Sequence, residues 1–528
     1  MPKFDLTTEP WIVCIKADGS PEQLGLRDVL ARAHELKALG NESPLLDAAL
    51  LRLCLAILHR CFGPSDKQAW RALQAAQRFD AAKIGAYLDA WRSGFDLFDA
   101  ERPFFQVARL VEQSKNYTTG LKPAREIIAE QSSYGGPREL FASRPSEGET
   151  IPFAVAARWL VAIQAFATGG LLTRDTANGD PTSATAAPLC STAVVTIRGR
   201  TLFDTLLLNL VTYPAARIFP WTAKDAPAWE LPPQPKFTKR PCHGWLDWLT
   251  WQSRRVQLIP HDDSGIGSFL LLNGCEVMTA ENIDIVDPMA ARRYSDTQKK
   301  FLPIAFTTDR AVWRDSTALY QVTESSDVRG ARVVEELAQR KVPDAQELEL
   351  QLYGQRPNKA SISFTRSEVV PLPAKLIHNP ELVAILRDEL AKAEAAQSAL
   401  RSALYLAFQH VLSLGERKPP GEEVGNMIEN SRGIPKYWGR LKTAFDAFLV
   451  SLVETDGSAT SVSEFRSAIW REAGEAFRAA ALSSSSSTRA LKAFTLGYDK
   501  LQLELRKAGL SPPAVADRQG AMQAEAKA

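Results

Sequence analysis

The chain has 528 residues, of which 45% are apolar and 23% are charged, a composition typical of globular proteins and unlike that of disordered or collagen-like chains. Because a domain usually takes roughly 150 residues, the length predicts two to four domains. The 63 Lys and Arg residues nearly balance the 61 Asp and Glu residues, which leaves a net charge of +2. Any nucleic-acid site must therefore be a local basic patch.

Targeting signals are not evident in the sequence. The opening residues, MPKFDLTTEPWIV, have no cationic stretch followed by an apolar one, so we expect no secretory signal and a cytoplasmic location. The most apolar run, residues 151–172, is interrupted by Arg158 and Gln164. Spanning a bilayer takes roughly 20 largely uncharged residues, so this run is expected to be a buried helix and no membrane association is expected.

Residues 1–370 are expected to form a large domain of mixed α/β structure. Apolar residues recur at helical spacing over 45–62 and again over 81–98, with a loop between these two helices. Short β-rich runs follow at 191–199 and 254–260. The fold class predicted for the whole chain is α+β.

Residues 371–511 are expected to form an antiparallel four-helix bundle, because the β signal disappears and four amphipathic patterns follow one another. The first begins at Asn379, which can cap a helix, and the second covers 435–454. The third is expected to start at the capping box Ser461-x-x-Glu464.

The fourth helix of the expected bundle carries an apolar seam at alternating spacings of three and four residues: Leu491, Phe494, Tyr498, Leu501 and Leu505. It is expected to stop at Gly509. Residues 512–528 lack apolar periodicity and are expected to be disordered.

Sequence motifs for catalysis are absent: we find no phosphate-binding loop, dinucleotide fingerprint, nucleophile elbow or kinase motif. The six cysteines form no CxxC pair and the six histidines no HExxH, so neither a metal nor a cofactor is expected. One alternative is a metal-dependent nuclease or phosphohydrolase built on His261 and Asp262. The other interpretation of PHDDSG (260–265) is an Asp-rich turn that closes a hairpin. We expect no catalytic residue and no enzymatic activity.

A basic hairpin is the clearest candidate for a binding site. Residues 347–353 and 361–366 alternate like strands, so 354–360 are expected to turn the chain. This segment and the second strand supply four polar or cationic side chains, Arg356, Asn358, Lys359 and Arg366. Such a tip suits a phosphate backbone or a minor groove, although Gly, Pro and Asn also form ordinary surface turns.

Two further loops have features of nucleic-acid binding. In 134–148, Phe141 could stack on a base beside two arginines, or could be buried in the core. The segment 167–190 is long and rich in small residues, and Gly169 and Gly170 would let the backbone approach a ligand closely. In the C-terminal region, the cluster Arg432, Lys436, Arg440 and Lys442 could contact phosphates or could be a solvated helix face.

An ordered set of segments resembles the CasA family, the large subunit of the type I-E CRISPR Cascade complex. The segments are FDLTTEPWIVCIKADG, LGLRDVLARAHEL, RPFFQV, LFDTLLLNLVTYP, IAFTTDRAVW and YGQRPNKASI. The likeness covers nearly the whole chain. It implies a non-catalytic subunit with a large N-terminal domain and a C-terminal four-helix bundle, at the 5′ end of the crRNA.

The resemblance also implies partners and a role. The expected partners are crRNA, double-stranded target DNA, other Cascade subunits and the CRISPR helicase-nuclease. The subunit would detect the short PAM in duplex DNA, largely from the minor groove, start strand separation, help hold the displaced strand and recruit the helicase-nuclease. A purely structural subunit of a ribonucleoprotein is a further alternative.

Site residues carried over from the family fall in three places. The hairpin that reads and wedges the PAM corresponds to Asn358, Lys359 and Ala360, and the glycine loop across the groove to Gly169 and Gly170. The loop that meets the crRNA handle and neighbouring subunits corresponds to Phe141, Ala142 and Ser143.

This sequence departs from the family pattern at two positions. Lys359 stands where the family has a glutamine wedge. The groove-reaching lysine has no counterpart in 275–288, and Arg292 or Arg293 could substitute for it.

Overall fold

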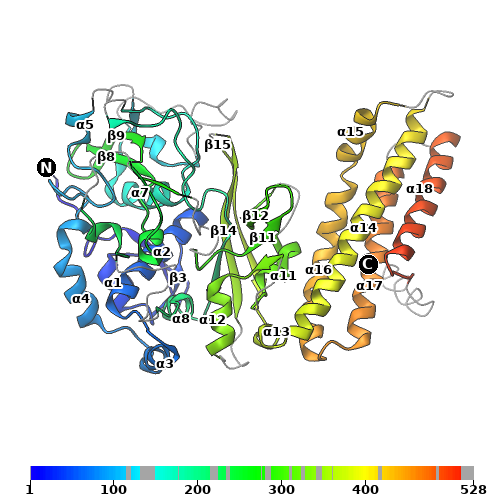
Figure 1. Cartoon of the computed structure of the whole chain (residues 1–528), viewed down its shortest axis with the longest axis horizontal. Helices are drawn as coiled ribbons and strands as arrows, with labels where there is room; N and C mark the ends of the chain where they lie inside the picture. Colours follow the sequence, from blue (N-terminus) through cyan, green and yellow to red (C-terminus); the bar gives the residue numbers. More distant parts are fainter. Residues whose placement is uncertain are drawn as a thin grey trace. The chain divides into compact units, whose positions relative to one another are not determined.

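A computed structural model describes residues 2–114, 120–130, 149–175, 178–213, 224–232, 238–274, 276–279, 287–307, 312–322, 327–340, 348–359, 361–413, 419–482 and 487–512. The chain folds into two compact units, Met1–Ala374 and Lys375–Ala528 (Figure 1). The first mixes helices and strands, whereas the regular structure described in the second is helical. The antiparallel four-helix bundle expected over 371–511 stays a prediction, and so does the disorder of the tail, most of which lies outside the described residues.

Helix α2 (Pro44–Cys61) is the central helix of the first unit. Ser43 caps it, because the Ser43 Oγ accepts a hydrogen bond from the Leu45 N–H at 3.2 Å. Its side chains are buried on nearly every face, as expected for a helix surrounded by other elements. It packs against α4 (Ala81–Ala90), α7 (Phe153–Phe166) and α9 (Trp245–Leu249). The helix predicted over 45–62 is thereby confirmed.

Helix α7 occupies most of the apolar run at 151–172, and the prediction of a buried helix is confirmed. Within the described ranges, no helix has both the length and the apolar character needed to cross a membrane. The Arg158 guanidinium is buried, donating to the Trp11 carbonyl at 2.6 Å and to the Glu42 carboxylate at 3.1 Å. A charged side chain is tolerated there because it is paired.

The remaining helices described in the first unit are short. The α-helices are α1 (Leu26–Ala31), α3 (Lys67–Ala76), α5 (Leu110–Gln113), α8 (Leu202–Asn209), α11 (Ser316–Leu319) and α12 (Arg332–Arg340). The 3₁₀ helices are η1 (Arg92–Phe95), η2 (Ala124–Ile127), η4 (Ala228–Glu230) and η5 (Val312–Asp315). The helix expected over 81–98 ends at Ala90 and continues as η1, where Gly94 lies against Trp229.

Among the described residues, three small sheets belong to the first unit. Strand β1 (Ile12–Lys16) lies between β2 (Pro21–Leu24) and β3 (Leu36–Leu39). Strand β11 (Arg292–Ser295) lies between β12 (Lys300–Pro303) and β13 (Val328–Arg329). Strands β7 (Thr238–Arg240) and β10 (Glu276–Met278) form a parallel pair.

A larger sheet is built on β9 (Gly265–Asn273), which pairs with β4 (Leu121–Pro123), β5 (Ile151–Pro152) and β8 (Arg254–Pro260). Strand β8 matches the strand predicted at 254–260. The turn between β8 and β9 is closed by Asp262, whose Oδ1 accepts hydrogen bonds from the Ser264 and Gly265 N–H groups at 2.8 and 2.9 Å. The interpretation of 260–265 as a hairpin turn is confirmed.

The candidate hairpin belongs to a sheet of its own. Strand β14 (Glu349–Asn358) is central, between β15 (Ser361–Pro371) and β6 (Val194–Arg198), and Figure 1 shows the hairpin as a long pair of strands. Leu350 and Leu352 are fully buried, which confirms the inward alternation expected for the first strand. Strand β6 confirms the strand expected within 191–199.

The second unit contains α13 (Ala374–His378, whose first residue belongs to the first unit), α14 (Pro380–Leu412), α15 (Gly421–Ser431), α16 (Gly433–Glu454), α17 (Ala459–Leu482) and α18 (Thr488–Lys507). Helix α14 packs against α15, α16, α17 and α18. Asn379 caps α14 as predicted, accepting from the Glu381 N–H at 3.0 Å. The four expected helical patterns correspond to α14, α16, α17 and α18, whereas α13 and α15 were not predicted.

Two details of these helices differ from the sequence expectations. Helix α17 begins before Ser461, which is buried with its Oγ 2.5 Å from the Ser451 Oγ, and Ser458 accepts the Ser461 N–H instead. In α18 the buried stripe is Ala490, Ala493, Gly497, Leu501 and Leu505, whereas Leu491 is 56% exposed. Small residues replace the larger seam because α14 approaches closely: a Cβ on Gly497 would lie 3.0 Å from the Ala403 carbonyl oxygen.

Candidate nucleic-acid interface

The hairpin tip is narrower than the sequence suggested. The ladder between β14 and β15 continues to the pair Asn358 and Ser361, so the strands reach well into 354–360 and the expectation that all seven residues turn is wrong. The ladder has an irregular register between Arg356 and Pro357. Proline cannot donate to a ladder, and such a bulge lets it remain within the hairpin.

Asn358 and Lys359 are both exposed at this tip. Lys359 has a φ of 54°, a left-handed conformation that is costly for a residue with a Cβ. The Asn358 carbonyl accepts from the Ser361 Oγ at 2.9 Å, which closes the turn. Within the described part of the chain, neither the Asn358 side chain nor the Lys359 ammonium has a hydrogen-bond or ion-pair partner.

The other cations of the hairpin are less available. Arg366 forms an ion pair with Glu368 at 3.3 Å, and its guanidinium lies 4.7 Å from the ring centre of Phe364. Arg356 is half-buried, opposite Phe364 in the ladder. The positive charge at the tip itself is therefore that of Lys359.

The glycine loop, residues 167–175 and 178–190, has one isolated β-bridge within its described part. The Gly170 N–H donates to the Ala184 carbonyl at 3.1 Å, and the Ala184 N–H donates back at 2.8 Å. Gly170 has a φ of 142°, which a residue with a Cβ rarely adopts, and a Cβ on Gly169 would lie 3.0 Å from the Ala186 nitrogen. The conformation of Gly170 thus favours glycine, and a larger residue at Gly169 would make the neighbouring backbone shift. Leu171 follows them and is 84% exposed.

Arg254, at the start of β8, holds both sides of the glycine loop. Its side chain is 3% exposed and donates to the Thr168 carbonyl at 2.7 Å and to the Thr185 carbonyl at 3.0 Å. Gln164 in turn fixes Arg254, because its Oε1 accepts from the Arg254 N–H at 2.8 Å. The loop backbone is therefore anchored by buried side chains although it carries little regular structure.

Several expected site residues cannot be placed. Ala360 and the three residues expected to meet the crRNA handle, Phe141, Ala142 and Ser143, lie outside the described residues. Of the two candidate substitutes for a groove-reaching lysine, Arg292 is only 6% exposed on β11. Arg293 donates to the Asp315 carboxylate at 2.8 Å. Neither arginine extends from the surface as an unpaired cation.

The basic cluster in the second unit is split between two faces of α16. Arg432, Lys436 and Arg440 are spaced four residues apart and are all exposed. Arg440 donates to Glu472 at 2.5 Å, and Arg471 pairs with the same carboxylate at 3.0 Å. Lys442 lies off this stripe and pairs with Asp446 at 2.5 Å.

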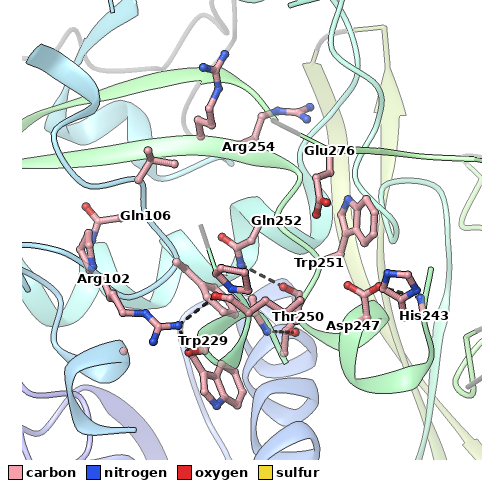
Figure 2. A pocket seen from close by; sticks show the side chains of 18 of the residues that line it. Arg102, Gln106, Trp229, His243, Asp247, Thr250, Trp251, Gln252, Arg254 and Glu276 are labelled. Carbon is pink, nitrogen blue, oxygen red and sulfur yellow. Dashed lines mark hydrogen bonds between the residues drawn. The ribbon is translucent and has the colours of Figure 1, made fainter. Parts of the chain in front are cut away.

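A pocket that the sequence analysis did not single out lies between η4, α9 and the segment 102–107. Its volume is about 440 Å³, and its walls include the aromatic rings of Phe105, Trp229 and Trp251. Figure 2 shows Arg102 and Gln106 on one side of it and Asp247 and His243 on the other. Five Lys or Arg residues line it against two carboxylates: Arg102, Lys224, Arg240, Arg254 and Arg255 against Asp247 and Glu276.

The two carboxylates that line this pocket both pair with Arg240. The Arg240 guanidinium donates to Asp247 and Glu276 at 2.5 to 2.9 Å and lies 4.4 Å from the ring centre of Trp251. Burial and the charge of Arg240 lower the pKa of His243. Signals for the pocket were visible in the sequence as RPFFQV and RPCHGWLDW, but aromatic runs of this kind more often indicate core.

Metal binding finds no support in the described ranges. No group of three or more His, Cys, Asp or Glu side chains there is placed to hold an ion. Asp262 is fully exposed, and hydrogen bonds from Ser264 and Gly265 lower its pKa. These hydrogen bonds engage the carboxylate of Asp262 in the turn.

Comparisons with known proteins agree along nearly the whole chain. A family model described as CRISPR-associated protein Cse1 matches residues 5–482. The CRISPR-associated protein CasA/Cse1 of Thermus thermophilus is 31% identical over 511 residues, covering 94% of this chain and 96% of that protein.

Solved structures show the same likeness. The crystal structure of CasA from Thermus thermophilus superposes with a TM-score of 0.79 at 29% identity, covering 96% of this chain and 99% of that one. A chain from a CRISPR RNA-guided surveillance complex has a TM-score of 0.76 at 22% identity, covering 95% of this chain and all of that one, which is a likeness of fold.

Proposed function

Because the chain belongs to the CRISPR-associated Cse1 family, we propose that it is the non-catalytic large subunit of a type I-E Cascade complex and recognises the PAM in double-stranded DNA. In this role it starts duplex unwinding so that the crRNA can pair with its target. Its partners are the crRNA, the other Cascade subunits, the target DNA and the helicase-nuclease that it helps recruit. It acts in the cytoplasm.

The observation that carries this proposal is the hairpin tip. An amide and an ammonium group are exposed side by side at the end of a long two-stranded support. The amide of Asn358 can donate and accept, which suits the acceptor-rich edges of the minor groove. Lys359 adds a charge for phosphates, and its aliphatic stem is long enough to press against the first base step.

The glycine loop supports the same proposal from a second element. Gly169 and Gly170 are both partly exposed, so a DNA backbone or groove edge can reach their main chain. The adjoining Leu171 is an exposed apolar side chain of the kind that minor-groove proteins place against sugars and base steps. The loop backbone is fixed beforehand by Arg254, so little ordering is needed on binding.

A short tag read from the minor groove would be recognised with tolerance. The minor groove distinguishes mainly A·T from G·C pairs, so related tags present similar patterns. Specificity for the long target sequence comes from base pairing with the guide RNA, as in RNA-guided effectors of another class.

Displaced-strand binding is the part of the proposal that concerns the second unit. The exposed stripe Arg432, Lys436 and Arg440, with Arg471 beside it, suits phosphates of a single strand. Lys442 belongs to a separate i,i+4 ion pair with Asp446 and is not part of this stripe.

The experiment is reconstitution of the complex with and without this chain, followed by binding to duplexes that share one target but differ in the flanking tag. We expect binding that depends on the tag only when the chain is present. Equal binding to all tags with the chain present would contradict PAM recognition and favour a purely structural role for the chain. DNA cleavage by the purified chain with Mg²⁺ or Mn²⁺, lost in His261→Ala, would instead favour the nuclease.

A further inference from the structure

The hairpin and the glycine loop are joined by one buried side chain. Gln355 on β14 is fully buried, and its Nε2 donates to the Phe166 carbonyl at 2.7 Å and to the Cys190 carbonyl at 3.3 Å. Phe166 is the last residue of α7, three residues before Gly169. Gln355 lies on β14, three residues before Asn358. A single amide group therefore touches the base of both candidate DNA-binding elements.

The Cys190 thiol adds a second link in the same place. The Gln355 Nε2 also approaches the Cys190 Sγ at 3.6 Å. Burial raises the pKa of this thiol, while hydrogen bonds from Gln355, Ser191 and the Gly169 N–H oppose that rise. The sulfur thus stands between the hairpin and the first glycine of the loop.

The Gln355 amide is retained at a cost. Its Oε1 accepts no hydrogen bond from the described residues, and a buried acceptor without a partner costs about 1–3 kcal/mol. An apolar side chain of the same length would avoid that cost. We therefore infer that this position needs the N–H donors of the Gln355 amide. One of them satisfies a carbonyl at the C-terminal end of α7, where helical partners run out.

We propose that Gln355 is a positioning residue that fixes the spacing between the hairpin tip and the glycine loop, and thereby sets how sharply the two together discriminate PAM sequences. The functional half of this statement rests on the proposed function. The structural half does not, because it concerns the distance between two elements of the isolated chain.

The structural test is a distance measurement in the full-length chain. Leu171→Cys and Ser363→Cys, both exposed, carry spin labels in a background with Cys61→Ser and Cys275→Ser. We expect one narrow distance distribution in this parent and a broader or shifted one after Gln355→Met, which keeps length but removes the donors. An unchanged distribution would overturn the coupling.

A matched control separates this effect from general loss of stability. Asn209 is a buried amide of the same chemistry that donates to the Ile197 and Thr205 carbonyls at 2.7 Å. Ile197 pairs with Leu350, toward the other end of β14 from the tip. Asn209→Leu should therefore lower the thermal midpoint without broadening the distance, and equal broadening in both variants would count against a specific role for Gln355.

The functional arm uses the reconstituted complex. For Gln355→Met we expect the ratio of affinities for good and bad tags to fall about tenfold, which corresponds to the loss of roughly one hydrogen bond's contribution. Affinity for DNA without any tag should stay within about twofold. If the distance broadens while tag discrimination is unchanged, the coupling stands and the proposed reading of the PAM by these two elements is wrong.

Discussion

Lys359→Gly should stabilise the protein and weaken its DNA binding at the same time. Lys359 holds a φ of 54°, which costs a residue with a Cβ about 1–2 kcal/mol, whereas glycine adopts it freely. Glycine also makes the unfolded chain more flexible, at a cost of about 0.4–1 kcal/mol. The difference leaves a net stabilisation of about 0.8 kcal/mol. Chemical denaturation of the purified chain measures this value.

Lys299→Gly is a matched control for that experiment. Lys299 is also an exposed lysine with a positive φ, 52°, in the turn between β11 and β12. Both variants should gain similar stability, but only Lys359→Gly should lower the affinity of the reconstituted complex for target duplexes and flatten its salt dependence. The reasoning is refuted if Lys359→Gly is clearly destabilising, or if the two variants bind DNA equally well.

Three further predictions concern charge. Burial raises the pKa of Asp47 to about 6, so the contribution of Asp47 to stability is largest at low pH and declines as pH rises from about 4 through 6. Asp47→Asn should therefore stabilise the protein by about 1–2 kcal/mol at pH 8 and little at pH 4. Denaturation curves at both pH values measure this difference. Arg52 pairs with the buried Asp287 at 3.0 Å, so Arg52→Leu should cost about 3–5 kcal/mol at pH 7 by the same assay, and adding Asp287→Asn should restore much of the loss. Reversing Arg432, Lys436 and Arg440 to Glu should expose the displaced strand to a single-strand nuclease, whereas Lys442→Glu should not; equal protection in both would remove the stripe from the proposal.

Local patterns in the sequence predicted several of the elements. Helix α2 was predictable because its apolar residues recur at helical spacing, and strands β6 and β8 because each lies in a short β-rich run. Helix α15 was missed because only Val424 and Ile428 are buried on it, which leaves too weak an apolar pattern.

Tertiary contacts decided the features that the sequence analysis misjudged. The buried stripe of α18 includes small residues and not the expected Leu491, because α14 packs closely against Gly497. The spacing of residues within α18 does not reveal this contact. The turn was expected to cover all of 354–360 because Gly354 and Pro357 usually break strands, yet β14 continues to Asn358 because its pairing with β15 extends that far.

Part of the candidate site was also beyond sequence reasoning. Asn358, Lys359, Gly169 and Gly170 could be singled out as exposed or conformationally special residues. Gln355 could not, because its partners Phe166 and Cys190 are far away in the chain and only the fold brings them together.

The most direct test of the central claim is the binding of the reconstituted complex carrying Asn358→Ala and Lys359→Ala to duplexes that differ only in the flanking tag, at several salt concentrations. The parent complex should prefer good tags, and the double variant should lose that preference, with about 1–3 kcal/mol attributable to the Asn358 amide, while assembly with the crRNA and the other subunits is unchanged. A double variant that assembles, binds and discriminates as the parent does would show that the hairpin is only a turn.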